Sequence, residues 1–353
     1  MKSCLSVTRM VFAAALIISV LSGPTIAQDA GPLKVGMIGL DTSHCLAFTK
    51  ILNKTDDPKH VPGCRVVMVY PKGSPDIESS VSRVPGYTQE ITKLGVQVVN
   101  DLDAMVQQVD AVLLETNDGR PHLEQVIPVL KARKPCFIDK PIAGSLEDCL
   151  AIFKLARHYE TPVFSSSSLR FGKSTQAVRN GSIGDVTGCD TWSPCSLEKT
   201  HPDLFWYGIH GVESLFTVMG SEVESVVRTQ TPDFEQVTGV WSGGRIGTFR
   251  GIRAGKGGYG GQAFGKDGVS AVGSYDGYEP LAVEIVKFFQ TKVVPVDPEE
   301  TISIYAFMEA ADESRRQNFR PVRISDVLAQ AEQAANAKVA RLLGEPASSD
   351  VRR

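Results

Sequence analysis

A lysine at the end of an apolar segment is the first candidate for chemistry in this chain of 353 residues. Lys140 follows Phe137-Ile138-Asp139 and precedes Pro141. Proline lacks a backbone donor and biases the residue before it away from helical geometry, so the chain must turn out of a strand here. Open parallel sheets bind ligands at the carboxyl ends of their strands. A surface lysine beside a turn proline explains the tripeptide equally well, so the surrounding elements decide.

The first half of the chain alternates between two kinds of segment. Apolar, β-branched runs predict strands at 34–38, 65–70, 96–99, 111–115, 136–139 and 162–164, and helical patterns are found at 45–54, 87–94, 102–109, 121–133 and 146–159. This alternation is typical of an α/β fold with a doubly wound parallel sheet of the Rossmann type. Lys140 is therefore expected at the ligand-binding edge of that sheet. The serine run 165–168 leaves the last strand at the same edge, either to meet a polyol or as an ordinary polar exit.

The second half has a different pattern. Strands are predicted at 223–231, 237–241 and 246–252, the last two joined by the hairpin signal at 242–245. The glycine-rich segment 255–261 is interpreted as a flexible hairpin loop, and helices are predicted at 279–290, 298–316 and 324–343. This order indicates a C-terminal α+β domain with a mainly antiparallel open sheet. The expected division is 28–164 for the Rossmann-type dinucleotide-binding domain, 165–323 for a substrate and oligomerisation domain, and 324–353 for a helical tail.

The N-terminus and the composition indicate the cellular location of the protein and the classes of partner to expect. Lys2 and Arg9 precede an apolar run at 11–21, and small residues end at Ala27, which predicts a Sec-type signal peptide over 1–27 and a periplasmic or secreted protein. Its removal changes the net charge from −3 to about −5, and no basic patch suggests nucleic acid. After cleavage no membrane association is expected. The six cysteines that follow Cys4 are interpreted mostly as buried thiols, with Cys189 and Cys195 the one nearby pair.

With these elements placed, the chain resembles the Gfo/Idh/MocA oxidoreductases, the family of glucose-fructose oxidoreductase and inositol dehydrogenase, from about residue 34 to 322. The motifs that carry the resemblance keep the family's order and spacing. They are Asp139-Lys140-Pro141 for its Glu-Lys-Pro, Thr116 to His122 for its Thr-Pro-x-x-x-His, Arg170-Phe171, Ile183-Gly184-Asp185-Val186, Gly208-Ile209-His210 and Phe319-Arg320-Pro321-Val322.

The resemblance implies an oxidoreductase that acts on CH–OH groups with NAD or NADP. The family lysine lies between the nicotinamide and the substrate hydroxyl, and the histidine serves as acid and base. Alcohol oxidation needs a base for the hydroxyl proton and a cation for the developing alkoxide, which assigns His210 and Lys140. Glu213 shares a helix face with His210 and is expected to orient its ring. The implied cofactor-binding residues are Gly39, Asp41, Thr42, Ser43, Tyr70, Thr116, His122, Asp139, Lys140 and Arg170.

Three positions depart from the family pattern, and one of them is Trp206, where the family often has an acid four residues before the histidine. The dinucleotide motif Gly-x-Gly-x-x-Gly falls on residues 39–44 and keeps only Gly39, because Asp41 and His44 replace the other glycines. Asp41, Thr42 or Ser43 could simply cap the following helix, cofactor binding could be altered, or a new polar site could lie at the strand end. The second strand ends in Tyr70-Pro71-Lys72-Gly73-Ser74 rather than in an acid, which suits either the 2′-phosphate of NADP or a plain turn.

The leading hypothesis is therefore an exported NAD(P)-dependent oxidoreductase-like protein that acts by hydride transfer on a sugar, cyclitol or polyol. The alternative is a catalytically degenerate family member that serves as a carbohydrate-binding or partner protein without productive NAD(P) binding. A cofactor-retaining lyase or hydrolase is a third option. No metal site is predicted, since His201, Asp203, His210 and Glu213 form no known zinc spacing. An open sheet in the second domain makes a face-to-face homo-oligomer plausible.

Overall fold

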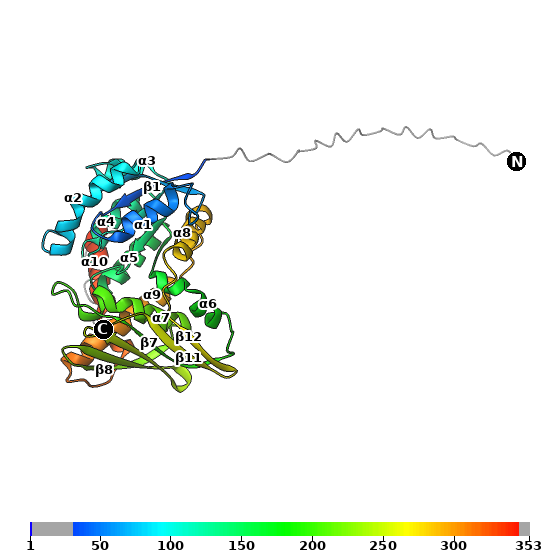
Figure 1. The fold of residues 1–353 in the computed structure, drawn as a ribbon, viewed down its shortest axis with the longest axis vertical. Coiled ribbons are helices and arrows are strands. Elements are labelled where there is room, and N and C mark those ends of the chain that lie inside the picture. The colour runs from blue at the N-terminus through cyan, green and yellow to red at the C-terminus, as the bar shows by residue number, and fades with distance from the viewer. Residues whose placement is uncertain (2–30, 346–353) are drawn as a thin grey trace. The chain divides into compact units, whose positions relative to one another are not determined.

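The computed structural model describes residues 31–345 together with Met1, so the rest of the predicted signal peptide lies outside the described residues. Its first sheet has six parallel strands in the order β3-β2-β1-β4-β5-β6 (Figure 1). The strands are β1 Leu33–Ile38, β2 Cys64–Tyr70, β3 Gln97–Val98, β4 Ala111–Leu114, β5 Cys136–Asp139 and β6 Val163–Ser166. The predicted doubly wound sheet is confirmed. Because β1 pairs with both β2 and β4, the winding reverses between β1 and β4, where such sheets bind ligands.

Helices cover both faces of this sheet. They are α1 Ser43–Asn53, α2 Glu78–Lys93, α3 Leu102–Gln108, α4 His122–Lys131 and α5 Leu146–His158. Buried residues alternate along the strands, so Met37 packs towards α1 while Ile38 packs towards α3 to α5. α2 begins nine residues before the predicted start at 87, because Pro85 lies inside the helix instead of preceding it.

A late segment completes one face of the first sheet. α8 (Glu279–Thr291) buries Leu281, Ile285 and Phe288 in the same hydrophobic cluster as α1 and Phe137 of β5. Figure 1 shows α8 lying beside α1. The sequence boundary at residue 164 therefore does not separate two independent packing units.

The second sheet has seven strands in the order β12-β11-β7-β10-β9-β8-β13. They are β7 Val186–Pro194, β8 Val223–Gln230, β9 Phe234–Trp241, β10 Arg245–Ile252, β11 Gly260–Gly265, β12 Gly268–Val272 and β13 Val322–Arg323. The sheet is antiparallel except for the β7–β10 pair, and β9 and β10 form the predicted hairpin. The predicted flexible loop 255–261 is shorter than expected, since β11 begins at Gly260.

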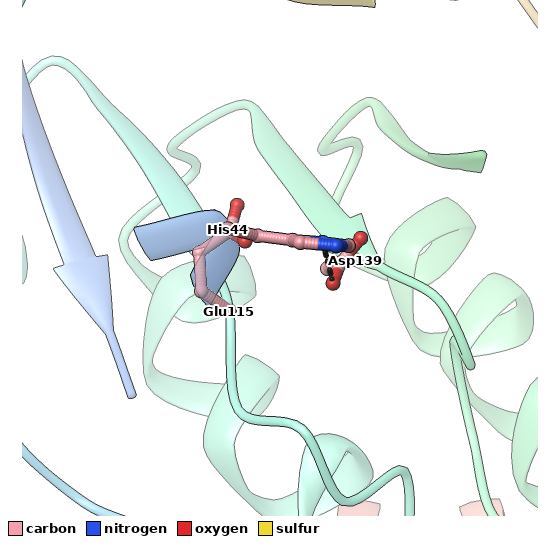
Figure 2. A group of neighbouring side chains, drawn as sticks. All are labelled: His44, Glu115 and Asp139. Atoms are coloured by element: carbon pink, nitrogen blue, oxygen red, sulfur yellow. Dashed lines mark hydrogen bonds and ion pairs between the residues drawn. The ribbon is translucent and has the colours of Figure 1, made fainter. Parts of the chain in front are cut away.

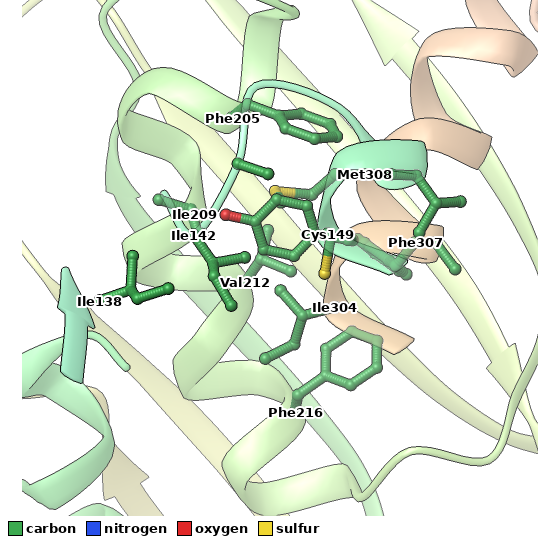
Figure 3. Close-up of a cluster of buried hydrophobic side chains, with 14 of the residues drawn as sticks. Ile138, Ile142, Cys149, Phe205, Ile209, Val212, Phe216, Ile304, Phe307 and Met308 are labelled. Carbon is green, nitrogen blue, oxygen red and sulfur yellow. The ribbon is translucent and has the colours of Figure 1, made fainter. Parts of the chain in front are cut away.

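One face of the second sheet is covered and the other is open. α7 (Ile209–Met219) and α9 (Pro298–Arg316) pack on the covered face, where they share a core with the first sheet through Ile138, Ile142 and Cys149 (Figure 3). α10 (Ile324–Leu343) packs on α5, as the predicted tail helix should. A row of apolar residues crosses the open face from β9 to β12: Val240, Ile246, Phe264 and Val269, with Trp192 nearby on β7.

The six cysteines of the described part are all free and buried, which confirms the interpretation as buried thiols. No helix within residues 31–345 is both long and apolar enough to span a bilayer.

Candidate active site

Lys140 lies directly after β5, at the carboxyl edge of the first sheet. Its side chain is buried, with 5% of the residue exposed, and Nζ is 3.8 Å from Oδ2 of Asp139. Burial works to raise the pKa of Asp139, but the neighbouring His44 and Lys140 charges outweigh it and hold that pKa below its usual range. The pair therefore places a fixed cation beside a carboxylate that stays ionised.

His210 comes to the same place from the first turn of α7. Its Nδ1 is 2.7 Å from the hydroxyl of Ser167, which follows β6. Burial lowers the pKa of His210 well below its usual value, and the charge of Lys140 lowers it further. The imidazole is therefore neutral at neutral pH and able to accept a proton. Within residues 31–345 its Nε2 makes no hydrogen bond, so this nitrogen is available to a substrate.

Glu213 supports this site in a different way from the one expected. No hydrogen bond in the described residues joins it to His210 directly. Its carboxylate accepts hydrogen bonds from the hydroxyl of Ser166 at 2.7 Å and from the backbone N–H of Ser167 at 2.9 Å. Because Ser167 contacts His210, Glu213 orients the imidazole only through that serine.

Arg170 and His122 are placed as structural residues. Arg170 is 2% exposed, and its guanidinium binds Glu213 and Glu300 at 2.7 Å each. His122 is fully buried, with Nε2 2.8 Å from the carbonyl of Thr116 and Nδ1 3.2 Å from that of Ile142. Both side chains are buried among protein groups, although Nη2 of Arg170 has no hydrogen-bond partner in the described residues, and their role in cofactor binding stays a prediction.

Four tyrosines form a series of ring contacts between His210 and His44. The rings of Tyr207 and Tyr259 lie 5.1 and 5.9 Å from that of His210, and their hydroxyl oxygens are 3.0 Å apart. Tyr275 and Tyr278 continue the row, and Tyr278 lies 4.7 Å from the ring of His44. Tyrosine offers an apolar face and a polar hydroxyl, a combination suited to a polyhydroxylated ligand. Sequence reasoning missed these residues because they come from three separate segments.

The turn after β1 is built around Gly39 and Asp41. Gly39 has φ of 97°, and a Cβ there would lie 2.5 Å from the backbone nitrogen of Thr116, so only glycine lets the ends of β1 and β4 approach. Asp41 is fully buried and accepts hydrogen bonds from the N–H of Asn117 and the hydroxyl of Ser80. Burial raises the pKa of Asp41. Asp41 therefore does not cap α1.

The cap of α1 is Thr42, whose hydroxyl accepts from the N–H of His44 at 3.4 Å. Of the three capping residues considered from the sequence, the structure selects this one. Ser43 opens the helix and is exposed, and Tyr70 is half-buried at the end of β2 with Nζ of Lys72 5.7 Å from its ring.

The connection from β2 to α2 packs against the turn that follows β1. The N–H of Leu40 bonds to the carbonyl of Lys72, and the hydroxyl of Ser74 bonds to Asp118 at 2.5 Å. Arg120 bonds to both Asp118 and Asp76. Burial works to raise the pKa of Asp118, but hydrogen bonds from His201, Arg120 and Ser74 outweigh it and lower that pKa.

A dinucleotide in the usual position runs from the N-terminus of α1 to the end of β2. That route passes through the direct Ser74–Asp118 contact and over the buried Asp41 side chain. The residues present therefore do not fit NAD or NADP in this arrangement. Sequence reasoning singled out Asp41 but missed the Ser74–Asp118 contact, because it joins residues 44 positions apart.

The four residues with metal-ligand side chains around position 210 do not converge. His201 lies 3.0 Å from Asp118, Asp203 binds Arg228 and Arg315, and Glu213 binds Arg170. His44, at the third glycine position of the motif, instead reaches β5, where its Nδ1 is 2.7 Å from Oδ2 of Asp139.

A family model and several curated proteins match part of this chain. Residues 33–166 match the model of GFO_IDH_MocA, described as an oxidoreductase family with an NAD-binding Rossmann fold. An uncharacterised oxidoreductase of Streptococcus pneumoniae is 26% identical over 155 residues, which is 39% of this chain and 42% of the relative. Inositol 2-dehydrogenase 3 of Saccharopolyspora erythraea is 32% identical over 122 residues, which is 35% of this chain and 30% of the relative. The matches thus span less than half the length of these curated relatives.

The fold itself is shared over a greater length. The crystal structure of a probable dehydrogenase from Thermotoga maritima has a TM-score of 0.66 at 21% identity and covers 84% of this chain and 100% of its own. The similarity thus includes the second sheet as well as the first.

Proposed function

Because the chain belongs to the Gfo/Idh/MocA oxidoreductase family through its residues 33–166, we propose that it is an exported family member that acts on a sugar, cyclitol or polyol. The site is the one around Lys140 and His210. We propose also that it works without NAD or NADP held in the crevice beside Gly39. This assignment combines the family's substrate class with the residues that this chain presents.

The arrangement around His210 supports a polyhydroxylated substrate. Lys140 supplies a cation that favours an alkoxide, and the neutral His210 accepts a proton from a hydroxyl through Nε2. Ser167, held by Glu213, fixes the ring. Tyr207 and Tyr259 add aromatic faces and hydroxyls beside it. The name of the inositol dehydrogenase relative points to the same class of substrate.

The proposal that no dinucleotide is bound rests on the contacts made by Ser74, Asp118 and Asp41 beyond the end of β1. Ser74 and Asp118 are in direct hydrogen-bond contact, and Asp41 is fully buried between Asn117 and Ser80. A pyrophosphate there would also lie against the carboxylates of Asp41 and Asp118, which repel it. This chain therefore corresponds more closely to the alternative without productive dinucleotide binding, although its acid–base residues are kept.

NAD(P)-dependent hydride transfer is the second candidate, and one observation favours it. Lys140 and His210 share one site even though they lie 70 positions apart in the sequence, as expected for alcohol oxidation. A bound dinucleotide would supply the hydride acceptor. For it to enter, Ser74 of the β2–α2 connection must leave Asp118, and Ser80 of α2 must leave Asp41.

Calorimetry on the mature protein distinguishes the two candidates. NAD, NADP and NADH are titrated separately, followed by a panel of hexoses, alditols and cyclitols that includes D-glucose and myo-inositol. We expect no binding of any dinucleotide and saturable binding of at least one polyol, abolished or weakened in Tyr259→Ala. Dinucleotide binding, or nucleotide released when the purified protein is denatured, would refute the cofactor-free proposal. Absence of binding across the whole panel would refute the substrate class.

Asp41→Gly sharpens this experiment. If a dinucleotide binds beside Gly39, removal of one carboxylate should strengthen binding by about 1–2 kcal/mol. If the crevice is closed by the Ser74–Asp118 contact as well, the substitution restores no binding. Asp56→Asn, which removes an exposed carboxylate in the turn after α1, is the matched control.

Export is part of the proposal and rests on Lys2, Arg9 and the apolar run 11–21. The mature chain is expected to begin near Gln28 and to accumulate outside the cytoplasm. N-terminal sequencing of the protein from its native host checks this, and an intact segment 1–27 on a cytoplasmic protein would contradict it.

A further inference from the structure

Three side chains that can ligate a metal meet at the carboxyl ends of β1, β4 and β5. His44 is in the first turn of α1, Glu115 directly follows β4, and Asp139 ends β5 (Figure 2). One ligand atom from each residue lies within 4.8 Å of the other two. The cluster is thus assembled by the sheet itself, from residues as far apart as 95 positions.

Glu115 makes this cluster unusual. The residue is fully buried, and neither carboxylate oxygen has a hydrogen-bond partner in the described part of the chain. Buried carboxylates are normally paired or hydrogen-bonded, because an uncompensated buried charge is strongly unfavourable. The carboxylate therefore needs either a proton or a cation.

The surrounding charges leave room for a cation. Lys140 lies 3.8 Å from Asp139 and balances one of the two carboxylates. Glu115 is the second carboxylate, and no cationic side chain in residues 31–345 forms an ion pair with it. His44 is only 12% exposed on its side chain, and Tyr278 packs against it, so the cluster is shielded from bulk water.

We propose that His44, Glu115 and Asp139 form a binding site for one first-row divalent cation. An imidazole nitrogen with two carboxylate oxygens suits Mn²⁺, Fe²⁺ or Zn²⁺ better than the all-oxygen sets preferred by Ca²⁺. Ligands bonded to one metal at about 2.1 Å lie at most about 4.2 Å apart. Ligand atoms up to 4.8 Å apart must therefore move closer by roughly half an ångström. The ion separates His44 from Asp139 and completes the coordination of Glu115.

This site occupies the strand ends beside Lys140, where Asp41 and His44 replace the expected glycines. A new polar site at the strand end was one of three alternatives drawn from the altered glycine motif, and the proposal assigns three ligands to it. The proposal does not depend on the substrate or on the dinucleotide.

Metal binding is tested on the full mature protein after treatment with EDTA. Mn²⁺ and Zn²⁺ are titrated by calorimetry, bound Mn²⁺ is counted by electron paramagnetic resonance, and the melting temperature is measured with and without metal. We expect one ion per chain and a higher melting temperature in the presence of metal. Glu115→Gln and Asp139→Asn should each lose the bound ion and the rise in melting temperature. Asp76→Asn, which removes an exposed carboxylate on the connection from β2 to α2, should keep both.

A proton on Glu115 is the competing occupant, and the same variants identify it. In that case the wild-type protein binds neither ion up to about 1 mM, and the nearly isosteric Glu115→Gln protein matches it in melting temperature under all conditions. That result overturns the proposal. Metal binding that persists unchanged in Glu115→Gln overturns it as well, because the ion then lies elsewhere.

Discussion

Replacement of Arg170 by methionine is the sharpest test of how the site is held. The guanidinium lies between Glu213, which supports Ser167 beside His210, and Glu300 at the start of α9. All three residues are buried, with at most 7% of each exposed. Methionine keeps most of the aliphatic volume and removes only the charge and its hydrogen bonds.

The expected cost follows from what each carboxylate keeps. Glu300 retains Arg179, whose guanidinium is 2.9 Å away, so it stays compensated. Glu213 retains only neutral donors, the Ser166 hydroxyl and the Ser167 N–H. One buried carboxylate is thus left without a cation, for which a loss of about 3–5 kcal/mol in the free energy of unfolding is expected. This loss is a large share of the free energy of unfolding of a typical protein, but it is smaller than the whole, so the variant stays folded.

The loss should depend on pH with a definite sign. Burial works to raise the pKa of Glu300, but the charge of Arg170 and the hydrogen bonds from Arg179 and Arg170 outweigh it and lower that pKa. A lowered folded-state pKa contributes stability that is present above the unfolded pKa of about 4.3 and lost as the pH falls through the folded value. The charge of Arg170 is the largest of these lowering causes, so part of the deficit of Arg170→Met comes from Glu300, and that part should be largest at pH 7 and shrink below about pH 4.

Urea unfolding followed by tryptophan fluorescence and circular dichroism measures this difference. Arg179→Met is the matched control: its side chain is 37% exposed, pairs with Glu300 and also donates to the carbonyl of Thr217, so it should cost less than about 1 kcal/mol. An Arg170→Met protein within 1 kcal/mol of wild type at pH 7, on the scale of such exposed pairs, would refute the reasoning, as would a deficit that grows on acidification.

The other predictions concern the site and the assembly. Under the NAD(P)-dependent candidate, Lys140→Met and His210→Ala should each abolish turnover of the substrate found by calorimetry and leave the fold intact, and the double variant should be little worse, because groups that act together are not additive; near-normal activity in either protein would remove that residue from the mechanism. Ser167→Ala should lower kcat with little change in KM and cost no more than about 1 kcal/mol in stability, whereas a normal rate would end its role in orienting His210. Ile246→Glu on the open face of the second sheet should convert an oligomer into a monomer in sedimentation, while Val283→Glu on α8, another exposed apolar position, should not; a monomeric wild-type protein would contradict this.

Much of the fold could be predicted because its signals are local. The six strands of the first sheet follow apolar runs, and α9 and α10 begin and end at the predicted residues. β7 was not predicted as a strand, since Gly188, Asp190 and Pro194 weaken its pattern. It is stabilised by two neighbours from much later in the chain, β10 and β11. Such long-range pairing leaves no periodic trace in the segment itself.

The site was predictable only at the level of single residues. The strand-end position of Lys140 and the motif around His210 could be found from the sequence, and in the structure the charge of Lys140 lowers the pKa of His210. The partners could not be found in the same way. Glu213 on a shared helix face is a correct observation, yet Arg170 and Ser167 compete for its carboxylate and keep it from His210. Which of several polar neighbours a carboxylate contacts depends on three-dimensional packing.

The position of α8 bears on the order in which the chain folds. When residues 33–166 have left the ribosome or a translocation channel, the side of their sheet that carries Met37, Phe137 and Phe164 still lacks the helix that buries Phe288 against it. That surface stays open to water, and to chaperones, until α8 has also emerged. The N-terminal lobe thus cannot mature as a separate cotranslational domain, and its folding is delayed until most of the polypeptide has been made.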